Sequence, residues 1–214
     1  INIEQGSGDT VENINYFANL SVHDTSNVLI ENVFMKNNQF FDDMMHIIYS
    51  KNIKVKDSFF LNANADAIDT DISNGVYFEN IKIENAKNDG LDFMESEANI
   101  ENSIILLSGD KGVSVGENSS IKINNTQIKD NEIGIASKDS SLAEINNSIF
   151  SNNKIHLNVY KKNWRYGSSG SIVAKNSKFN ISNKNFLSDK TGKIIIDKSN
   201  FIKSIESSEN VIFK

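Results

Sequence analysis

The chain has 214 residues, contains no Pro and no Cys, and carries a net charge of −6 from 22 Lys and Arg against 28 Asp and Glu. Without cysteine the fold has no disulfides and no thiolate metal sites, and no apolar run approaches the roughly 18 residues of a membrane-spanning helix. Arg165 is the one arginine, so the bidentate contacts that favour phosphate recognition are scarce. We therefore expect neither membrane insertion nor a nucleic-acid partner.

The first 25 residues contain scattered apolar side chains that fit the following repeat poorly, so residues 1–25 are predicted to form an irregular first coil. Since the first residue is Ile1, we expect a processed product or a segment of a longer protein with additional domains. After this segment, a motif of Asn, a small or β-branched residue, any residue and an apolar residue recurs. Its members begin at Asn32, Asp57, Asn80, Asn102, Asn125, Asn147, Asn176 and Lys198. Most steps are 22 or 23 residues, which indicates a structural repeat.

Within each repeat, apolar and polar residues alternate, as at Ile53 and Val55 or at Val76 and Phe78, and no stretch has helical periodicity. A unit of about 22 residues with two or three short strands cannot close a core alone, but stacked copies can. The Leu consensus of leucine-rich repeats is missing. We therefore predict an all-β fold: a right-handed parallel β-helix of about eight coils of 22–23 residues, forming a single domain over residues 1–214. Amides of the Asn column are expected to form a ladder along one corner.

One step of 29 residues contains an insertion at residues 161–170, which is predicted to be a protruding loop. The loop holds the single Trp and the single Arg of the chain, Trp164 and Arg165. These side chains could stack on a sugar ring, or Trp164 could pack back onto its own coil. The second alternative is the prediction.

Two lines of polar residues run across the predicted coils, and each line takes one residue from each coil. The outward line is His46, Asp69, Asp92, Ser114, Ala136 and Asn158, and the line at the strand entries is Asp43, Asp66, Asp89, Lys111, Ile133 and Ile155. Carboxylates stacked at roughly 4.8 Å must raise their pKa values, gain hydrogen bonds or share a cation. Calcium, which prefers oxygen ligands, is the expected cation; zinc fits less well because one His is near. The simpler alternative is that each Asp caps backbone N–H groups of a turn.

The two lines bring together the carboxylates of Asp66, Asp69, Asp89 and Asp92. Further polar residues lie beside them: His46, Tyr49, Ser114 and Glu117 are the expected substrate-binding residues. Asp71 and Glu95 lie beyond the same columns.

Residues 64–119 resemble the central coils of polysaccharide-active β-helix enzymes of the pectin-lyase-like superfamily, in particular the polygalacturonase type. The matching strings are residues 64–69 (NADAID), 88–92 (NDGLD) and 110–116 (DKGVSVG). The resemblance implies that Asp66 and Asp89 are active-site carboxylates. The chain departs from the hydrolase pattern because Asn88 replaces an acid and Lys111 replaces a His.

A carboxylate cluster beside a Lys instead resembles the calcium-dependent polysaccharide lyases of this superfamily. That resemblance implies calcium-assisted β-elimination on an acidic, uronate-containing polysaccharide, with Lys111 as the base and Asp66 and Asp89 beside it. It also implies the calcium ligands, which are expected to be Asp66, Asp69, Asp89 and Asp92. For this role the pKa of Lys111 must fall from about 10.4 towards neutrality. The alternatives are a non-catalytic β-helix module of a larger bacterial surface or cell-envelope protein, and an inverting glycoside hydrolase. All of these imply an extracellular or cell-envelope location.

Overall fold

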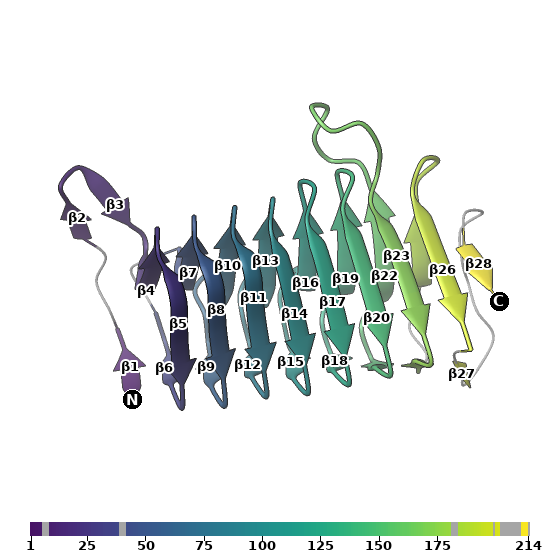
Figure 1. Ribbon diagram of the computed structural model, residues 1–214. Coiled ribbons are helices and arrows are strands. Elements are labelled where there is room, and N and C mark those ends of the chain that lie inside the picture. The colour runs from purple at the N-terminus through teal and green to yellow at the C-terminus, as the bar shows by residue number, and fades with distance from the viewer. Residues whose placement is uncertain (6–8, 39–41, 181–183, 199, 202–210, 214) are drawn as a thin grey trace.

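The computed structural model describes residues 1–5, 9–38, 42–180, 184–198, 200–201 and 211–213. Strands, and no helix, form the regular structure of this part of the chain. They stack into three parallel sheets that wind around one core (Figure 1), which confirms the predicted parallel β-helix. Within the described ranges there is no helix that is long and apolar enough to cross a membrane.

Each full coil contributes one strand to each sheet, in a fixed order. Sheet 1 consists of β4 (Ala18–His23), β7 (Asp43–Ile48), β10 (Ile68–Asp71), β13 (Leu91–Met94), β16 (Lys111–Gly116), β19 (Ile133–Lys138), β22 (Ile155–Tyr160) and β25 (Lys184–Ser188). Sheet 2 consists of β5 (Ser26–Glu31), β8 (Lys51–Lys56), β11 (Asn74–Glu79), β14 (Glu97–Glu101), β17 (Ser120–Asn124), β20 (Leu142–Asn146), β23 (Ser171–Lys175), β26 (Lys193–Asp197) and β28 (Val211–Phe213). Sheet 3 consists of β1 (Asn2–Glu4), β6 (Phe34–Lys36), β9 (Phe59–Leu61), β12 (Lys82–Glu84), β15 (Ile104–Leu106), β18 (Gln127–Lys129), β21 (Ile149–Ser151), β24 (Lys178–Phe179) and β27 (Asn200–Phe201).

The core is a set of straight columns of apolar side chains, one residue per coil. In sheet 1, the column of Met45, Ile68, Leu91, Val113, Ile135 and Leu157 is fully buried and in register, as the repeat predicts. Because neighbouring side chains alternate between the two faces of a strand, the next residue of each strand lies on the outer face. The buried columns thus place the polar line of sheet 1 on the outside.

The predicted Asn column forms the corner between sheets 2 and 3, but its main role is conformational. Asn32, Asn80 and Asn147, like the other members, have a positive φ, between 49° and 55°, and Asn tolerates this left-handed region better than most residues. In this column, among the described residues, only Asn80 donates its amide to a neighbouring member, Asp57, at 2.6 Å. The expected amide ladder therefore does not run along this corner.

An amide ladder does occur at the corner between sheets 3 and 1. Asn62 Nδ2 donates to Asn37 Oδ1 at 2.8 Å, and Asn85 Nδ2 donates to Asn62 Oδ1 at 2.7 Å. Buried serines order the remaining corner, between sheets 1 and 2: Ser73 Oγ accepts from Ser50 N at 3.0 Å. All three corners thus fix the coil register through side chains of successive coils.

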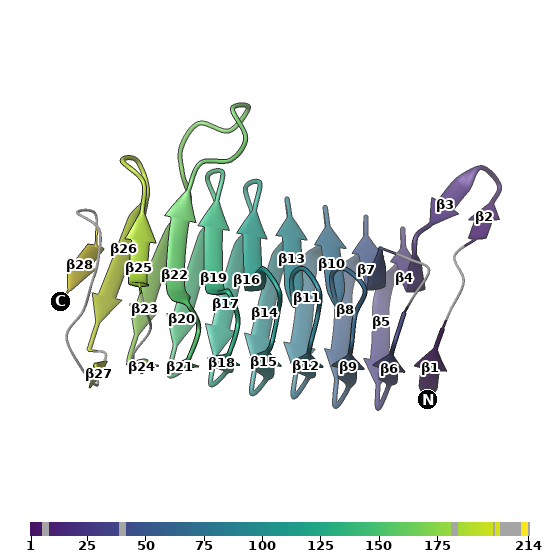
Figure 2. The same ribbon diagram turned by 180° about the vertical axis from the view of Figure 1, so that it is seen from behind.

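The irregular part of residues 1–25 is a hairpin. β2 (Asp9–Val11) and β3 (Ile14–Tyr16) pair antiparallel and project from the first coil (Figures 1 and 2). On either side of it, β1 pairs with β6 in sheet 3 and β4 pairs with β7 in sheet 1. The regular winding of sheet 1 therefore already begins at Ala18.

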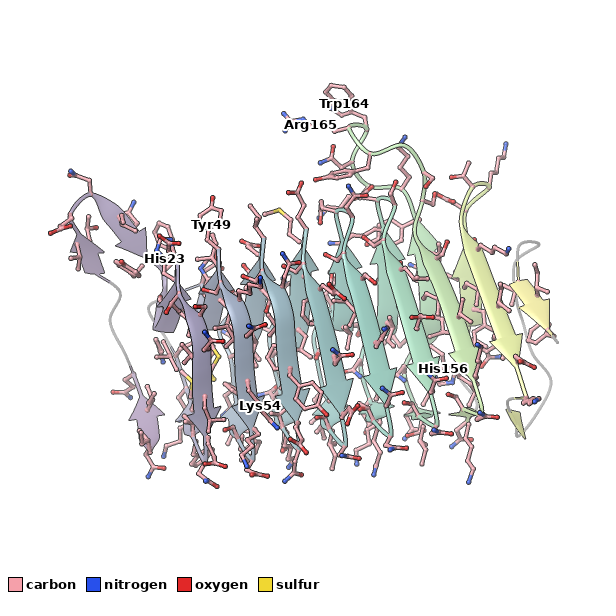
Figure 3. All side chains as sticks on the ribbon, in the orientation of Figure 1. His23, Tyr49, Lys54, His156, Trp164 and Arg165 are labelled. Carbon is pink, nitrogen blue, oxygen red and sulfur yellow. The ribbon has the colours of Figure 1, made fainter. Side chains whose placement is uncertain are left out.

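The insertion at residues 161–170 protrudes between β22 and β23, as predicted (Figures 1 and 2). The prediction that Trp164 packs onto its own coil is wrong, because this side chain is 83% exposed. Polar contacts hold the base of the loop instead of a buried indole: Asp139 Oδ1 accepts from the backbone N–H groups of Lys162 and Asn163. The indole and the guanidinium of Arg165 project from the top of the loop (Figure 3).

Candidate functional site

The outward line of sheet 1 is continuous in the structure. The residue pairings align Ser21, His46, Asp69, Asp92, Ser114, Ala136 and Asn158 across seven adjacent strands. The expected polar line is therefore confirmed as a geometrical feature, and it starts one coil earlier than expected, at Ser21.

At the strand entries, the carboxylates of Asp66 and Asp89 each bind the backbone of the following coil. Asp66 Oδ1 accepts from Asp89 N and from Asn88 Nδ2, both at 2.7 Å. Asp89 Oδ1 accepts from Lys111 N at 2.9 Å. These bonds are the capping arrangement that was the simpler alternative for an Asp at a strand end.

Burial sets the ionisation of the entry column. Desolvation, followed by the charge of Asp66, raises the pKa of Asp43 to about 7. Desolvation also raises the pKa of Asp89 to about 7, although the charge of Lys111 opposes it, and it raises the pKa of Asp66. Burial therefore favours the protonated form of these three acids of the entry column.

Lys111 is buried beside two carboxylates. Its Nζ lies 3.4 Å from Asp89 Oδ1 and also binds Asp110 Oδ2, and its side chain is 8% exposed. Burial disfavours the charged ammonium, but the charges of Asp89 and Asp110 outweigh it, so the pKa of Lys111 is raised above its usual value. This direction is opposite to the one that a general base needs, and the arrangement suits Lys111 as a fixed positive charge.

The side chains that converge well enough to hold a cation are His46, Asp69 and Asp71. Their nearest ligand atoms all lie within 4.8 Å of one another, and His46 Nε2 is 3.3 Å from Asp71 Oδ2 and 3.6 Å from Asp69 Oδ2. Asp92 is the register neighbour of Asp69 on β13. Of the four expected calcium ligands, Asp69 and Asp92 thus stay on the open face, whereas Asp66 and Asp89 point into backbone contacts.

Carboxylates lie close together in this cluster and affect one another's ionisation. Burial, followed by the charge of Asp71, raises the pKa of Asp69 to about 9, and the charges of Asp43 and Asp92 add to this effect. A divalent cation would relieve the repulsion among these carboxylates. Asp69 and Asp71 supply the oxygen ligands that calcium prefers, His46 supplies a nitrogen beside them, and Asp92 is the register neighbour of Asp69.

The next strands of the same face are basic. The side chain of Lys138 on β19 is 4% exposed, and its Nζ lies 3.9 Å from Asp92 Oδ1. It reaches that acid across β16, where a Cβ on Gly116 would lie 2.7 Å from Lys138 Cε. Ser114 is completely buried, and burial raises the pKa of the nearby Tyr160 phenol, which feels the charges of Lys111 and Lys138.

The remaining expected substrate-binding residues, Tyr49 and Glu117, lie at the corner between sheets 1 and 2. Tyr49 is 53% exposed and packs edge-on against His23, with ring centroids 5.8 Å apart. Burial raises the pKa of Glu117. Next to His46, a pocket of about 140 Å³ is lined by Asn15, Tyr16, Phe17, Ser21, His23, His46 and Ile48. Of the expected site residues, His46 and Asp69 belong to the tight cluster, whereas Tyr49 and Glu117 lie at the neighbouring corner.

Sequence reasoning included Asp71 in the polar group without assigning it as a ligand, and it gave no site role to Lys138 or Tyr160. A signal for Asp71 exists, because it lies two residues after Asp69 and period-2 alternation puts both on the outer face. Lys138 occupies the same position on β19 as Asp71 on β10. Its contact with Asp92 depends on a long side chain that crosses one strand, which spacing alone does not reveal.

Comparison with known proteins identifies the family of the fold. The model of the right-handed β-helix region matches residues 43–212. The search of curated proteins gives no match. Among solved structures, the surface adhesin PfbA of Streptococcus pneumoniae has a TM-score of 0.67 and 15% identity, over 87% of this chain and 60% of that chain.

Two polysaccharide-degrading enzymes are similar in the same way. An exopolygalacturonase from Thermotoga maritima has a TM-score of 0.71 and 14% identity, over 90% of this chain and 54% of that chain. An alginate lyase from Paenibacillus sp. str. FPU-7 has a TM-score of 0.61 and 10% identity, over 90% of this chain and 99% of that chain. The chain thus spans less than two thirds of the adhesin and of the exopolygalacturonase. Its three parallel sheets and the family match over residues 43–212 show that the chain belongs to the right-handed β-helix family, with the pectin-lyase-like fold.

Proposed function

We propose that the outer face of sheet 1 binds an acidic, uronate-containing polysaccharide and cleaves it by β-elimination. The observation that carries the proposal is the juxtaposition of Asp69, Asp71 and Asp92 with Lys138 on one face. Lys111 adds a buried cation beside Asp89 at the strand entries of the same sheet. A uronate unit has a carboxylate that needs positive charge and a neighbouring ring proton that needs a base. This face supplies groups for both needs.

Calcium remains part of the proposal, but its position no longer includes Asp66 and Asp89, which bind the backbone. Asp69, Asp71 and Asp92 would hold it through carboxylate oxygens. When bound, calcium would neutralise the uronate carboxylate and acidify the ring proton beside it. The ammonium groups of Lys111 and Lys138 would provide fixed positive charge on the side of the uronate carboxylate opposite to calcium.

The base is the point at which the geometry changes the expectation from the sequence. Lys111 is charged and ion-paired, which suits binding of a carboxylate. His46 carries an imidazole whose Nε2 faces Asp71, and imidazole is the most frequent base in enzymes at neutral pH. We therefore assign removal of the proton to His46 and substrate binding to Lys111, with Tyr49, Ser114 and Glu117 beside them.

The test is an absorbance assay for unsaturated uronates on a panel of acidic polysaccharides, with calcium or with chelator. His46→Ala is expected to lower kcat by about 10²–10⁴-fold, the usual contribution of a general base. Lys111→Ala is expected mainly to raise KM, and Lys122→Ala, on exposed sheet 2, is the matched control. Full loss of kcat in Lys111→Ala with activity retained in His46→Ala would return the base role to Lys111. If no polymer yields an unsaturated product, the proposed β-elimination is wrong.

The inverting hydrolase is less compatible with this face. The nearest oxygens of Asp69 and Asp71 lie within 4.8 Å, whereas inverting hydrolysis uses carboxyl groups about 6.5–9.5 Å apart. A pair from this cluster leaves too little room for the attacking water. New reducing ends without unsaturated product would nevertheless identify hydrolysis in the same assay.

The second candidate is a non-catalytic, polysaccharide-binding module of a larger surface or cell-envelope protein. The observation that favours it is the similarity to the adhesin PfbA, of which this chain spans 60%. Both candidates imply a polysaccharide partner, an extracellular or cell-envelope location and room for additional domains. Polysaccharide binding without any product would decide for the module.

A further inference from the structure

The loop of residues 161–170 is held by specific contacts along its whole length. At its start, Asp139 Oδ1 accepts from Lys162 N at 2.8 Å and from Asn163 N at 2.7 Å. At its end, Ser168 N donates to Ser140 Oγ at 3.1 Å, and Ser140 N donates to Ser168 O at 3.0 Å. The protrusion is therefore a built structure with a fixed base.

The tip of the loop also has a defined shape and direction. Asn163 Oδ1 accepts from Arg165 N at 3.1 Å, and Asn163 O accepts from Tyr166 N at 3.3 Å. Tyr166 Oη donates to Glu95 Oε1 at 2.9 Å. Because Glu95 directly follows β13, the loop extends back across two coils towards the strand that carries Asp92.

Two side chains of the loop take no part in holding it. Trp164 is 83% exposed, and the guanidinium carbon of Arg165 lies 5.9 Å from the centroid of its ring. Both project away from the coils (Figure 3). They are also the only Trp and the only Arg of the chain. A fixed loop that presents a flat apolar ring beside a planar cation offers a surface to a partner.

We propose that Trp164 and Arg165 form a binding platform for a uronate unit of the acidic polysaccharide, outside the cleavage site; the identity of this ligand rests on the proposed function. The indole face would stack on the C–H face of a sugar ring, and the guanidinium would bind its carboxylate in a bidentate manner. The exposed Lys161 and Lys162 add positive charge to the same loop. In a chain with a net charge of −6, the loop is a local cationic surface that fits an acidic polymer.

Because Trp164 is the only tryptophan, its intrinsic fluorescence reports directly on this loop. We expect titration with an oligogalacturonate in the presence of chelator, which prevents calcium-assisted turnover, to change the emission of Trp164 saturably. A neutral glucan oligosaccharide is expected to cause a much weaker change. An equal change with polyglutamate would overturn the proposal in favour of binding to any polyanion, including acidic proteins. No change at saturating oligogalacturonate would overturn it as well.

Variants separate the platform from the cleavage site. Trp164→Ala is expected to weaken polysaccharide retention in affinity electrophoresis by about tenfold or more, as for other aromatic anchors, and Arg165→Gln more than Arg165→Lys. Leu29→Ala is the matched control, because Leu29 is an exposed apolar residue (57%) on sheet 2, away from the loop and from the proposed cleavage site. If Trp164→Ala still cleaves the polysaccharide and is retained by it as strongly as the parent protein, the binding platform is contradicted but the proposed cleavage is not. If the fluorescence of Trp164 changes but the absorbance assay detects no product, the proposed cleavage is contradicted but the binding platform is not.

Discussion

The outer face of sheet 1 has an acidic half and a basic half, which differ in how far their charged side chains are exposed and in how these are paired. On β7 and β10, the side chains of His46, Asp69 and Asp71 are 16–21% exposed, and that of Asp92 on β13 is 29% exposed. On β16 and β19, the side chains of Lys111 and Lys138 are 8% and 4% exposed. The acidic half is thus more exposed and has carboxylates close to one another, whereas the cations of the basic half are buried and paired with neighbouring acids.

The comparison shows how a solenoid builds a site from a repeated backbone. Every coil presents the same outward positions, so the residue at each position decides the chemistry of that coil. At the position of Asp71, the next coils have Met94, Gly116 and Lys138. A missing side chain at Gly116 is as important as the charges, because it leaves the space through which Lys138 reaches Asp92. One substitution per coil therefore converts the face from acidic to basic.

The largest expected effect concerns the ion pair at the border between the halves. Asp89→Ala removes the cap of Lys111 N and leaves the buried Lys111 ammonium without its fully buried partner. We expect the free energy of unfolding to fall by about 3–5 kcal/mol, as for other broken buried pairs. Urea denaturation measures it.

Two further variants control this prediction. Asp110→Ala removes the other partner of Lys111, whose side chain is 44% exposed, and is expected to cost about 1 kcal/mol or less. The double variant Asp89→Ala with Lys111→Met should regain part of the loss, because it removes the unpaired charge. Equal losses in the two single variants would contradict the asymmetry between the partners.

Calcium tests the open, acidic half. A ligand that binds only the native state at 100 times its Kd stabilises it by about 2.7 kcal/mol, roughly 5–10 °C in Tm for a chain of this size. Asp69→Asn and Asp71→Asn should abolish the increase in Tm, and Lys138→Met in the basic half should retain it. Identical melting with calcium and with chelator would remove calcium from this face.

The pH dependence of stability should come from the same acids. Burial raises the pKa of Asp69 to about 9 and that of Asp43 to about 7. Between the unfolded pKa of about 4 and these values, the native state binds more protons than the unfolded state, so stability falls as pH rises, by up to about 1.4 kcal/mol per pH unit for each group. Urea denaturation in chelator at pH 5 and pH 8 measures this fall.

Asp69→Asn should reduce the slope, most clearly above pH 7, because an amide does not titrate, whereas Asp43 and Asp89 still titrate near pH 7. Asp130→Asn, at the corner between sheets 3 and 1, is the matched control and should leave the slope unchanged. A parent protein that becomes more stable between pH 5 and pH 8 would show that these acids are ionised in the folded state.

The repeat made the fold predictable, because a period of 22 or 23 residues and alternating apolar residues determine both the coils and the side of each residue. His46, Asp69, Asp92 and Ser114 form one outward line for that reason. The direction of a side chain within its coil depends on local hydrogen bonds, which sequence spacing does not show. Asp66 therefore bends into the backbone of the next coil, although it was expected to face a cation.

The contacts of long side chains and of loops could not be predicted from the repeat for a related reason. Lys138 contacts Asp92 across an intervening strand, and Tyr166 contacts Glu95 although 71 residues separate them. Such contacts join positions that no period relates. For Trp164, the general tendency of aromatic residues to be buried predicted packing, but the polar base of the loop already determines where the indole points.

The smallest expected effects come from two buried hydroxyls, one in each half. Thr70 Oγ1 and Ser114 Oγ lie fully buried with no hydrogen-bond partner among the described residues. A buried polar group without a partner costs about 1–3 kcal/mol, so Thr70→Val and Ser114→Ala should each raise the free energy of unfolding by about 1 kcal/mol. Differential scanning calorimetry and urea denaturation measure this change.

Activity then separates the two hydroxyls. Thr70 alternates with Asp69 and Asp71 and faces the core, so Thr70→Val should change stability without changing KM. Ser114 lies on the outward line between Asp92 and Ala136, so a substrate that displaces the side chains covering it would gain the hydroxyl as a partner. A higher KM in Ser114→Ala, despite a more stable protein, would show that this hydroxyl is left unpaired for the ligand. An unchanged KM in both variants would restrict substrate contacts in the basic half to Lys111 and Lys138.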